Sequence, residues 1–339
     1  MGFITKDESE IFYEVSYSND NSLLLICENE KFLFTDGRYF EEAKAAATDC
    51  EVVCADSLIK GVASAARGLR LKKITFDPTV FSYDEFRNLQ KLAPSFLEAK
   101  KGALAKKRVI KTESELQKIR KAVKLGREGF KKFAKKINSL KSPPNEYDLA
   151  YLAKKTLTAK GAYDVSFEPI TAVDANAANP HARASEKKLS DGSLLLFDGG
   201  VKFERYCSDR TRTAFFRDGF SFTKTQTFKD KKLQHIYDTV LKAQESAIAA
   251  ARVGMRAKEL DKAARDVIEE AGYGKYFVHS LGHGVGLDIH EYPYIRKNSD
   301  EILSENTVFT VEPGIYIPGY AGVRIEDIVV LKADGAVIL

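Results

Sequence analysis

The chain has 339 residues, of which 44% are hydrophobic and 30% are charged, and its formal net charge is +5. These proportions are typical of a globular protein and exclude a largely disordered, collagen-like or membrane-embedded chain. A charge excess of this size, from 53 basic and 48 acidic side chains, gives no support for binding to nucleic acid. At about 150 residues per domain, the length predicts two domains.

The cysteines and the N-terminal residues indicate the compartment. Four cysteines are too few for a disulfide scaffold and fit a reducing environment. Residues 1–10 lack the basic and apolar regions of a signal peptide, and no apolar run reaches the roughly 18 residues that a membrane span needs. We therefore expect a cytoplasmic protein with no membrane partner.

Residues 1–111 are expected to form a small α/β accessory domain. Short apolar runs alternate with helical patterns, which favours a mixed sheet covered by helices. The expected elements are a hairpin formed by 23–27 and 32–34, a helix at 39–48, an apolar segment at 52–54, a strand at 74–76 and a helix at 83–92. Residues 100–112 are rich in lysine and arginine and are interpreted as a solvated linker.

Residues 112–339 are expected to form the second domain, in which a pattern of helix, helix and hairpin occurs twice. Thr112 and Glu115 have the spacing of a capping box, so a helix should begin there, continue to about residue 137 and end before Pro143. Further helices are predicted at 146–159, 228–252 and 257–271, with a hairpin at 193–216 and a strand-rich end at 276–331. The recurrence favours an internal duplication about a pseudo-twofold axis. The predicted fold class is therefore α+β.

The first hairpin carries two aspartates. Asp198 ends the apolar run 194–197, where burying a lone carboxylate would be very costly. A turn centred between Phe203 and Glu204 would place Asp198 directly opposite Asp209. Opposed residues lie about 4.5–5.5 Å apart at Cβ, and like charges at that distance repel each other.

The second hairpin carries two glutamates in a similar arrangement. Glu312 follows the apolar strand 307–311, and Glu326 lies within the segment 323–331. A turn centred on Gly319 would pair them. One such pair could be an exposed accident of the surface, but two pairs related by a repeat indicate a built site. Two divalent cations would balance four clustered carboxylates, and this donor set favours Mn²⁺, with Co²⁺, Fe²⁺ and Zn²⁺ as competitors.

Three of the five histidines fall in the segment 279–290. His279 and His283 have the spacing of a helical metal-binding pair, but the glycines at 282, 284 and 286 oppose a helix. We interpret these glycines as allowing close approach of the backbone to a bound group, and we choose His283 as the neutral nitrogen ligand. His235, within a predicted helix, is interpreted as structural.

At these residues the chain resembles the proline-cleaving metallopeptidases of the pita-bread fold, aminopeptidase P and prolidase. The motifs that carry the resemblance are Asp198 and Asp209 eleven residues apart, Gly282-His283-Gly284, Glu312-Pro313-Gly314 and Arg324-Ile325-Glu326-Asp327. The likeness covers roughly 112–339, and Leu33-Phe34-Thr35-Asp36-Gly37-Arg38-Tyr39 resembles the accessory domain of the same family.

The resemblance implies a dinuclear centre and a hydrolytic function. Asp198 would chelate one metal, Asp209 and Glu326 would bridge both, and His283 and Glu312 would complete the second. Glu312 would also serve as the acid/base group. The resemblance further implies that His279 and His290 contact the peptide and move protons, that His181 contacts substrate, and that Arg324 either anchors a carboxylate or orients Glu326.

The expected reaction is hydrolysis of the bond between an N-terminal residue and proline, in a di- or oligopeptide. The alternatives are a catalytically inactive peptide-binding module, a creatinase-like C–N hydrolase that works without metal, and a methionine aminopeptidase. The five intact ligand positions oppose the first two, and the accessory domain opposes the third. The sequence leaves prolidase and aminopeptidase P open, and the resemblance implies a homodimer.

Overall fold

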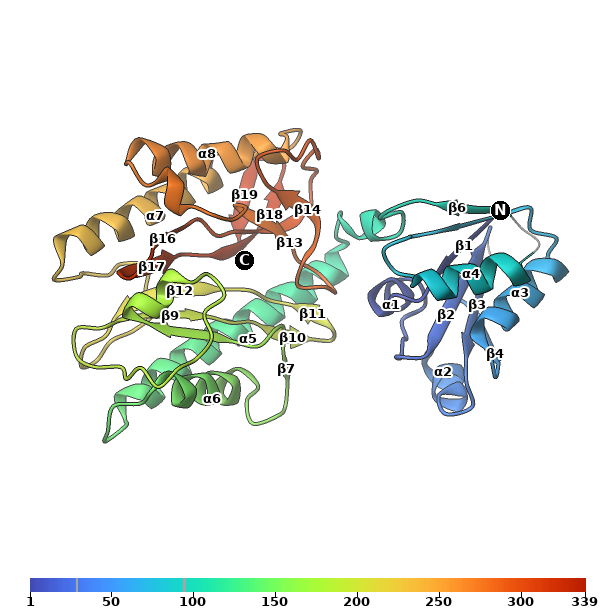
Figure 1. The fold of residues 1–339 in the computed structure, drawn as a ribbon, viewed down its shortest axis with the longest axis horizontal. Helices are drawn as coiled ribbons and strands as arrows, with labels where there is room; N and C mark the ends of the chain where they lie inside the picture. Colours follow the sequence, from blue (N-terminus) through green and yellow to red (C-terminus); the bar gives the residue numbers. More distant parts are fainter. Residues whose placement is uncertain (29, 94–95) are drawn as a thin grey trace. The chain divides into compact units, whose positions relative to one another are not determined.

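The computed structural model describes all residues except 29 and 94–95. The chain divides into two compact units, Met1–Arg108 and Val109–Leu339 (Figure 1). No helix among the described residues is both long enough and apolar enough to cross a membrane.

The unit Met1–Arg108 is built on a six-stranded mixed sheet with the order β4-β3-β2-β1-β5-β6. Its strands are β1 (Gly2–Thr5), β2 (Ser22–Cys27), β3 (Glu30–Thr35), β4 (Glu51–Cys54), β5 (Lys73–Phe76) and β6 (Phe96–Ala99). Its helices are α1 (Glu8–Val15), α2 (Phe40–Ala46), α3 (Leu58–Gly68), α4 (Tyr83–Leu92) and the 3₁₀ helix η1 (Ala105–Arg108). The predicted mixed sheet is confirmed, and the strands of the predicted hairpin pair antiparallel. Sequence patterns missed β1, α1, α3 and β6.

Two apolar layers cover the two faces of this sheet. Leu23 and Leu25 of β2 pack with residues of α3 and α4, whereas Leu24 packs with Ile11 and Val15 of α1. This division follows from strand geometry, because successive side chains of a strand point to opposite faces.

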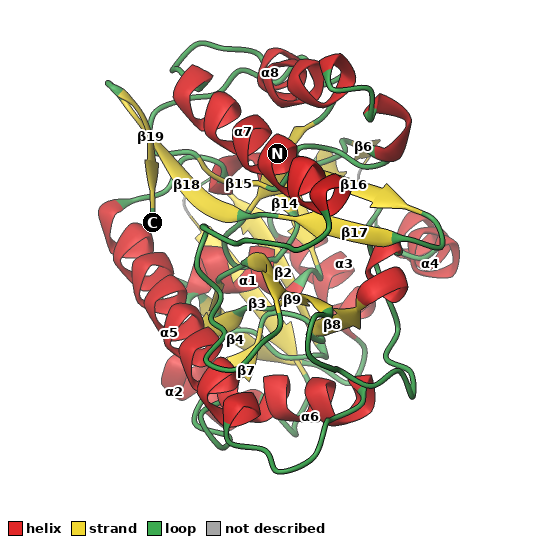
Figure 2. Ribbon diagram, turned by 90° about the vertical axis from the view of Figure 1, so that its left-hand side faces the viewer, coloured by secondary structure: helices red, strands yellow, loops and turns green. Residues whose placement is uncertain are grey.

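The unit Val109–Leu339 contains two helix pairs with strands between them (Figures 1 and 2). One pair is α5 (Glu113–Asn138) with α6 (Glu146–Leu157), and the other is α7 (Lys231–Ala250) with α8 (Ala257–Glu270). The remaining short helices are the 3₁₀ helices η2 (Asp174–Ala178) and η3 (Gly274–Tyr276). The first strands are β7 (Asp164–Val165), β8 (Ile170–Val173), β9 (Leu194–Asp198), β10 (Val201–Phe203), β11 (Tyr206–Cys207) and β12 (Thr211–Phe215).

The C-terminal strands form the second half of this unit. They are β13 (Gly282–Gly284), β14 (Glu291–Ile295), β15 (Val308–Val311), β16 (Gly314–Ile317), β17 (Ala321–Arg324), β18 (Asp327–Lys332) and β19 (Gly335–Ile338). The unit's sheets have the orders β11-β10-β7, β12-β9-β8, β14-β13-β15-β18-β19 and β16-β17.

Local sequence explains where the longest helix begins. Thr112 Oγ1 accepts a hydrogen bond from the backbone N–H of Glu115, and the Glu115 carboxylate accepts one from the N–H of Thr112. These bonds satisfy two N–H groups that the first helical turn would leave unpaired. The predicted capping box is therefore confirmed, and α5 ends at Asn138, before Pro143.

Strand β9 places the first carboxylate of the site. Leu195 and Phe197 pack with α5 and α6, whereas Leu194 and Leu196 pack with α7 and the C-terminal strands. Because β9 is buried on both faces, it is continuously apolar rather than alternating. Asp198 lies on the same face as Leu194 and Leu196, which points toward the other half of the unit.

The predicted register of the first hairpin is wrong by two residues. Thr211, not Asp209, lies opposite Asp198, and Phe203 lies opposite Tyr206. The turn is formed by Glu204 and Arg205, which both have positive φ angles, 46° and 71°. Positive φ at both central residues is typical of a tight two-residue hairpin turn, usually with Asn or Gly. Because side chains alternate between the two faces of a sheet, a shift of two residues leaves Asp209 on the face that was predicted.

The predicted register of the second hairpin is confirmed. Gly314 lies opposite Arg324, and Val311 lies opposite Asp327, as a turn centred on Gly319 requires. Glu312 and Glu326 occupy the break between the ladders β15–β18 and β16–β17. A corresponding break separates β9–β12 from β10–β11, and Asp209 lies in it. In both hairpins, therefore, acidic residues lie at corresponding points where the strand pairing is interrupted.

The end of the predicted linker is not a solvated connector. Lys111 is buried, and its Nζ lies 2.7 Å from Oε1 of Glu291. The sequence pattern could not show this pairing, because the partner lies far along the chain.

Candidate metal centre

All nine residues proposed from the sequence line one pocket of about 460 Å³ in the unit Val109–Leu339. They are His181, Asp198, Asp209, His279, His283, His290, Glu312, Arg324 and Glu326. The apolar part of the pocket wall is formed by Phe167, Ile170, Pro180 and Ile289. The remaining lining residues are Glu168, Ser280, Gly282 and Tyr294. The structure thus brings together residues from both hairpins and from the histidine segment.

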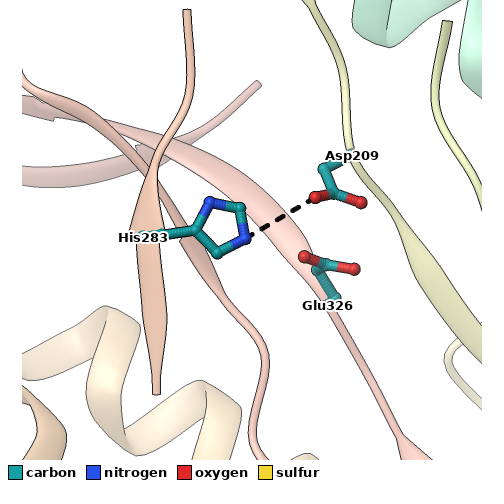
Figure 3. A group of neighbouring side chains, drawn as sticks. All are labelled: Asp209, His283 and Glu326. Atoms are coloured by element: carbon teal, nitrogen blue, oxygen red, sulfur yellow. Dashed lines mark ion pairs between the residues drawn. The ribbon is translucent and has the colours of Figure 1, made fainter. Parts of the chain in front are cut away.

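Asp209, His283 and Glu326, which line this pocket, point toward one another (Figure 3). One potential ligand atom from each lies within 4.8 Å of the others, and all three residues are buried. His283 Nε2 is 3.7 Å from Oδ2 of Asp209. Asp209 directly precedes Arg210 and β12, His283 lies on β13, and Glu326 lies between β17 and β18.

Glu312 and Asp198 lie beside these three residues. Glu312 Oε1 is 3.2 Å from Nε2 of His283 and accepts a hydrogen bond from Thr310 Oγ1 at 3.1 Å. Asp198 Oδ2 accepts a hydrogen bond from Arg324 Nη2 at 2.8 Å. All five predicted ligands therefore line the same pocket, and among the described residues Asp209, His283 and Glu326 are the group whose ligand atoms all lie within 4.8 Å of one another.

Burial and mutual repulsion dominate the electrostatics of the carboxylates. Burial, followed by the neighbouring carboxylates, raises the pKa of Asp209 and of Glu326 well above the ordinary value. Burial also raises the pKa of Asp198, although Arg324 opposes that shift. Burial raises the pKa of Glu312 too, but the hydrogen bond and charge of His283 outweigh it and bring the pKa to about 2.

Two oxygen atoms of the cluster identify where a cation would fit. Oδ1 of Asp198 and Oδ1 of Asp209 are buried and have no hydrogen-bond partner among the described residues. Buried carboxylate oxygens are normally paired, so an orphaned one calls for a counter-charge. Four carboxylates and one imidazole are a suitable donor set for Mn²⁺, Fe²⁺, Co²⁺ or Zn²⁺. The residues present therefore fit a divalent metal centre.

The hydrogen bonds of His283 set its orientation. Its Nδ1 lies 3.1 Å from the carbonyl oxygen of Gly284, so Nδ1 carries the proton that this contact needs. In the neutral ring, Nε2 then presents a lone pair toward the carboxylates, as a metal ligand must. Burial lowers the pKa of His283, but Glu312 more than offsets this, so that the pKa is raised.

His279 is held by a residue that the sequence analysis missed. Its Nε2 lies 2.8 Å from the hydroxyl of Tyr316, and its Nδ1 lies 2.8 Å from the carbonyl oxygen of Ser280. Nδ1 must donate to that carbonyl, so the Tyr316 hydroxyl donates to Nε2. Burial raises the pKa of Tyr316 to about 12, which keeps the hydroxyl protonated, and burial lowers the pKa of His279.

The glycine of the Glu312-Pro313-Gly314 motif makes room for this tyrosine. A Cβ added at Gly314 would lie 2.5 Å from the Tyr316 hydroxyl oxygen. The sequence contains this glycine, but it does not show the contact with Tyr316, because the two residues meet only in the folded strand.

Arg324 joins the two hairpins. Its Nη2 donates to Asp198, its Nε donates to Thr211 Oγ1 at 3.0 Å, and its Nη1 donates to the Tyr316 hydroxyl at 2.7 Å. Thr211 in turn donates to Glu326 at 2.7 Å. The guanidinium therefore orients one carboxylate directly and a second through Thr211.

The glycines around His283 are needed for packing within the chain. An added Cβ would lie 2.0 Å from the Thr310 carbonyl oxygen at Gly282, and 2.2 Å from that of Tyr292 at Gly284. At Gly286 it would lie 2.4 Å from the Glu291 carboxylate. These glycines therefore allow close packing against other segments of the same chain, and their expected approach to a bound group stays a prediction.

The remaining histidines divide between the pocket and the helices. The rings of His290 and His283 meet edge to face with centroids 4.3 Å apart. Burial, followed by the charge of His283, lowers the pKa of His290. His181 lies on the wall of the pocket. His235 lies on α7 with its ring centroid 5.8 Å from that of Tyr273.

Comparison with known proteins defines the class of this fold and site. Residues 117–333 match the metallopeptidase family M24, and residues 1–120 match the creatinase/prolidase N-terminal domain. The chain belongs to the metallopeptidase family M24, which confirms the resemblance to aminopeptidase P and prolidase.

Individual relatives extend this likeness over nearly the whole chain. The Xaa-Pro dipeptidase of Lactobacillus delbrueckii subsp. lactis is 36% identical over 342 residues, which cover 98% of this chain and 87% of the relative. The structure of an Xaa-Pro dipeptidase from Bacillus anthracis superposes with a TM-score of 0.91 at 31% identity, covering 99% of this chain and 92% of that one. An X-Pro aminopeptidase from Thermotoga maritima MSB8 gives a TM-score of 0.86 at 32% identity, with 99% and 94% covered.

Proposed function

We propose that the chain is a two-metal peptidase that hydrolyses the bond between an N-terminal residue and proline, and that dipeptides are its main substrates. The observation that carries this proposal is the convergence of four carboxylates and His283 in one buried pocket. Membership in family M24 supports the peptidase chemistry. The Xaa-Pro dipeptidases among the similar proteins support the preference for dipeptides.

The residues proposed to hold the metals are Asp198, Asp209, His283, Glu312 and Glu326. We propose Mn²⁺ as the native ion, since carboxylate-rich sites suit it. When bound, two divalent cations would supply Lewis acidity toward the scissile carbonyl group and positive charge that balances the four carboxylates.

Glu312 is proposed as the acid/base group. His283 lowers the pKa of this carboxyl to about 2 in the metal-free chain, and an ionised carboxylate can accept a proton from the attacking water. The same carboxyl can then return that proton to the departing proline nitrogen. Thr310 Oγ1 donates a hydrogen bond of 3.1 Å to Glu312 Oε1 and so helps to hold the carboxylate in place.

His279 and His290 are proposed to contact the peptide, but they differ in whether their ring nitrogens are already hydrogen-bonded. His290 is exposed on the pocket wall and can donate a hydrogen bond to the peptide or pass a proton to the leaving nitrogen. Both ring nitrogens of His279 are engaged, by Ser280 and Tyr316, so contact with substrate would replace the bond to Tyr316. His181 is proposed to contact the part of the substrate nearest the wall.

Arg324 is proposed to position metal ligands rather than to anchor a substrate carboxylate. Its Nη2, Nε and Nη1 donate to Asp198, Thr211 and Tyr316, respectively, so each nitrogen of the guanidinium already has a partner in the chain. Such outer contacts orient ligand oxygens and are commonly worth 10–100-fold in metal affinity or activity, as an order-of-magnitude figure.

The test is hydrolysis of Ala-Pro and Ala-Pro-Ala by the metal-stripped chain after separate addition of Mn²⁺, Co²⁺ or Zn²⁺. We expect metal-dependent cleavage, fastest with Mn²⁺ and with Ala-Pro. Faster cleavage of Ala-Pro-Ala would assign the aminopeptidase P activity instead. Binding of Ala-Pro without cleavage under any metal would support the inactive binding module, and creatine hydrolysis without metal would support the creatinase-like alternative.

We also propose that the chain acts as a homodimer, as the family resemblance implies. Light scattering of the metal-loaded protein at micromolar concentration measures the mass directly. A monomer mass that persists as the concentration is raised would contradict this assembly.

A further inference from the structure

A second pocket, of about 410 Å³, lies on the unit Val109–Leu339 between α5 and the segment 220–223. Arg127, Lys131 and Lys135 follow one another at intervals of four residues along α5, and Arg210, which directly precedes β12, lines the same pocket. Such intervals place side chains on one face of a helix. Among the described residues that line this pocket, four are basic and none is acidic.

The floor of the pocket is aromatic. Phe130, Phe220 and Phe222 are all buried, and their rings contact one another edge to face, with centroids 5.5 Å apart for Phe130 and Phe222 and 5.4 Å apart for Phe220 and Phe222. The Arg210 guanidinium lies 5.4 Å from the centroid of the Phe130 ring. The pocket therefore combines an apolar base with a cationic rim.

Arg210 provides a second, independent indication of a ligand. Its Nε is buried, and the guanidinium has no hydrogen-bond or ion-pair partner within the described parts of the chain. Its neighbour Arg212, which also has an unpartnered Nε, nevertheless donates to Asp327 at 2.6 Å and to two backbone carbonyl groups. Arg210 is only partly buried, and its positive charge lies at the pocket with no acceptor among the described residues, so it can pair with an anionic ligand.

The chemistry of these groups specifies the ligand. The planar guanidinium matches two oxygens of a carboxylate or a phosphate, and the lysines add point charges. The phenylalanines offer contact area to an apolar group attached to that anion. We propose that this pocket binds a small organic anion, a carboxylate or phosphate ester that bears an aromatic or aliphatic group.

This pocket shares no lining residue with the metal pocket. Arg210 directly follows Asp209, yet Asp209 lines the metal pocket and Arg210 lines this one. Loss of binding at the second pocket and loss of metal binding are therefore separable by experiment.

The test uses the full metal-loaded chain and three probes: phenyl phosphate, benzoate and inorganic phosphate. Titration calorimetry should show saturable binding of phenyl phosphate and benzoate, and at least about tenfold weaker binding of inorganic phosphate, which lacks the apolar group. Arg210→Met should weaken phenyl phosphate and benzoate binding by at least about tenfold, because a charge-assisted hydrogen bond is lost. Lys131→Met should weaken binding by a few-fold.

Lys136→Met is the matched control, since it removes the same charge from an exposed position of α5 that does not line the pocket. It should bind the probes like the wild type. Arg210→Met should change the melting temperature little, because Arg210 is partly exposed and makes no hydrogen bond or ion pair with the described residues. If that variant fails to fold, the exposed pair Lys131→Met and Lys135→Met tests the same claim.

Three results would overturn the proposal. One is the absence of saturable binding of phenyl phosphate and benzoate at millimolar concentration. Another is unchanged affinity in both the Arg210 and Lys131 variants, which would place the anion elsewhere, including at the metal centre. The third is equal affinity for inorganic phosphate and phenyl phosphate, which would exclude a role for the aromatic floor.

Discussion

Arg324 and Asp198 are joined by a hydrogen bond of 2.8 Å from Nη2 to Oδ2, which links the last strand of one hairpin to the first strand of the other. The two residues are 126 positions apart in the chain. The same guanidinium donates to Thr211, which holds Glu326. Two carboxylates proposed to bind metal thus depend on a single arginine.

Replacing Arg324 separates its two possible roles. Arg324→Met should weaken metal binding and lower kcat, each by about 10–100-fold, because Asp198 and Glu326 lose their orientation. Metal content by mass spectrometry and kinetics with Ala-Pro measure both effects. A large rise in KM for Ala-Pro at unchanged metal affinity would instead assign Arg324 to the substrate carboxylate.

Glu312→Gln tests the acid/base assignment with little change in shape. Turnover of Ala-Pro should fall by about 10²–10⁴-fold, the range that general acid/base groups commonly supply. Asp209→Asn should also abolish turnover, through loss of metal. Circular dichroism should show that both variants keep the fold. Near wild-type turnover in either variant would show that its assigned role is wrong.

Tyr316→Phe should affect catalysis through His279. Its hydroxyl donates to His279 and accepts from Arg324, so its removal leaves a buried ring nitrogen without its donor. We expect stability to fall by about 1–3 kcal/mol, and kcat to fall by about tenfold. Tyr320→Phe is the control, because Tyr320 lies on the same hairpin but donates to Asp230. Equal effects of the two variants on kcat would rule out a specific role for Tyr316.

The raised pKa values of Asp209 and Glu326 predict an unusual pH dependence for the metal-free chain. Groups with these raised values bind more protons when folded than when unfolded, so their contribution to stability falls as the pH rises above about 4. Melting temperatures of the metal-stripped chain should therefore decline from about pH 5 to pH 8 by more than those of the Asp209→Asn variant.

Metal binding should reverse that trend. Both carboxylates must be ionised to bind a cation, so binding releases protons and strengthens as the pH rises. Calorimetry with Mn²⁺ in two buffers of different ionisation enthalpy counts the protons released. Binding without proton release at about pH 5 would contradict the raised pKa values.

The buried ion pair between Lys111 and Glu291 should be structurally important. Lys111→Met leaves the Glu291 carboxylate buried without the lysine, which should cost about 3–5 kcal/mol of unfolding free energy. The double variant Lys111→Met with Glu291→Met should recover much of that loss, since both charges are gone. Urea denaturation measures each variant. Equal stability of the single variant and the wild type would exclude this role.

The sequence predicted the second hairpin better than the first for a local reason. Pro318 and Gly319 indicate their turn directly, and the pairing of Glu312 with Glu326 follows from it. Glu204 and Arg205 carry no such signal, although they adopt the positive φ angles that Asn and Gly usually supply. The register of Asp198 therefore could not be obtained from residue types alone.

The candidate ligands were predictable because acids in apolar strands are conspicuous. The residues that support the site were harder to predict, because Tyr316 contacts His279 from 37 positions away and Thr310 accepts a hydrogen bond from the backbone N–H of His283 from 27 positions away. The glycines around His283 show a related limit. The sequence predicted that something would approach these glycines closely. Only the folded structure shows that other segments of the same chain do so.

The most direct test of the central claim is the metal content of the purified chain after equilibrium dialysis against Mn²⁺, measured beside the Asp209→Asn variant. If the acids of both hairpins share bound cations, the wild type should retain two ions per chain and the variant should lose at least one. Retention of no ion by the wild type, or of two ions by the variant, would contradict the account.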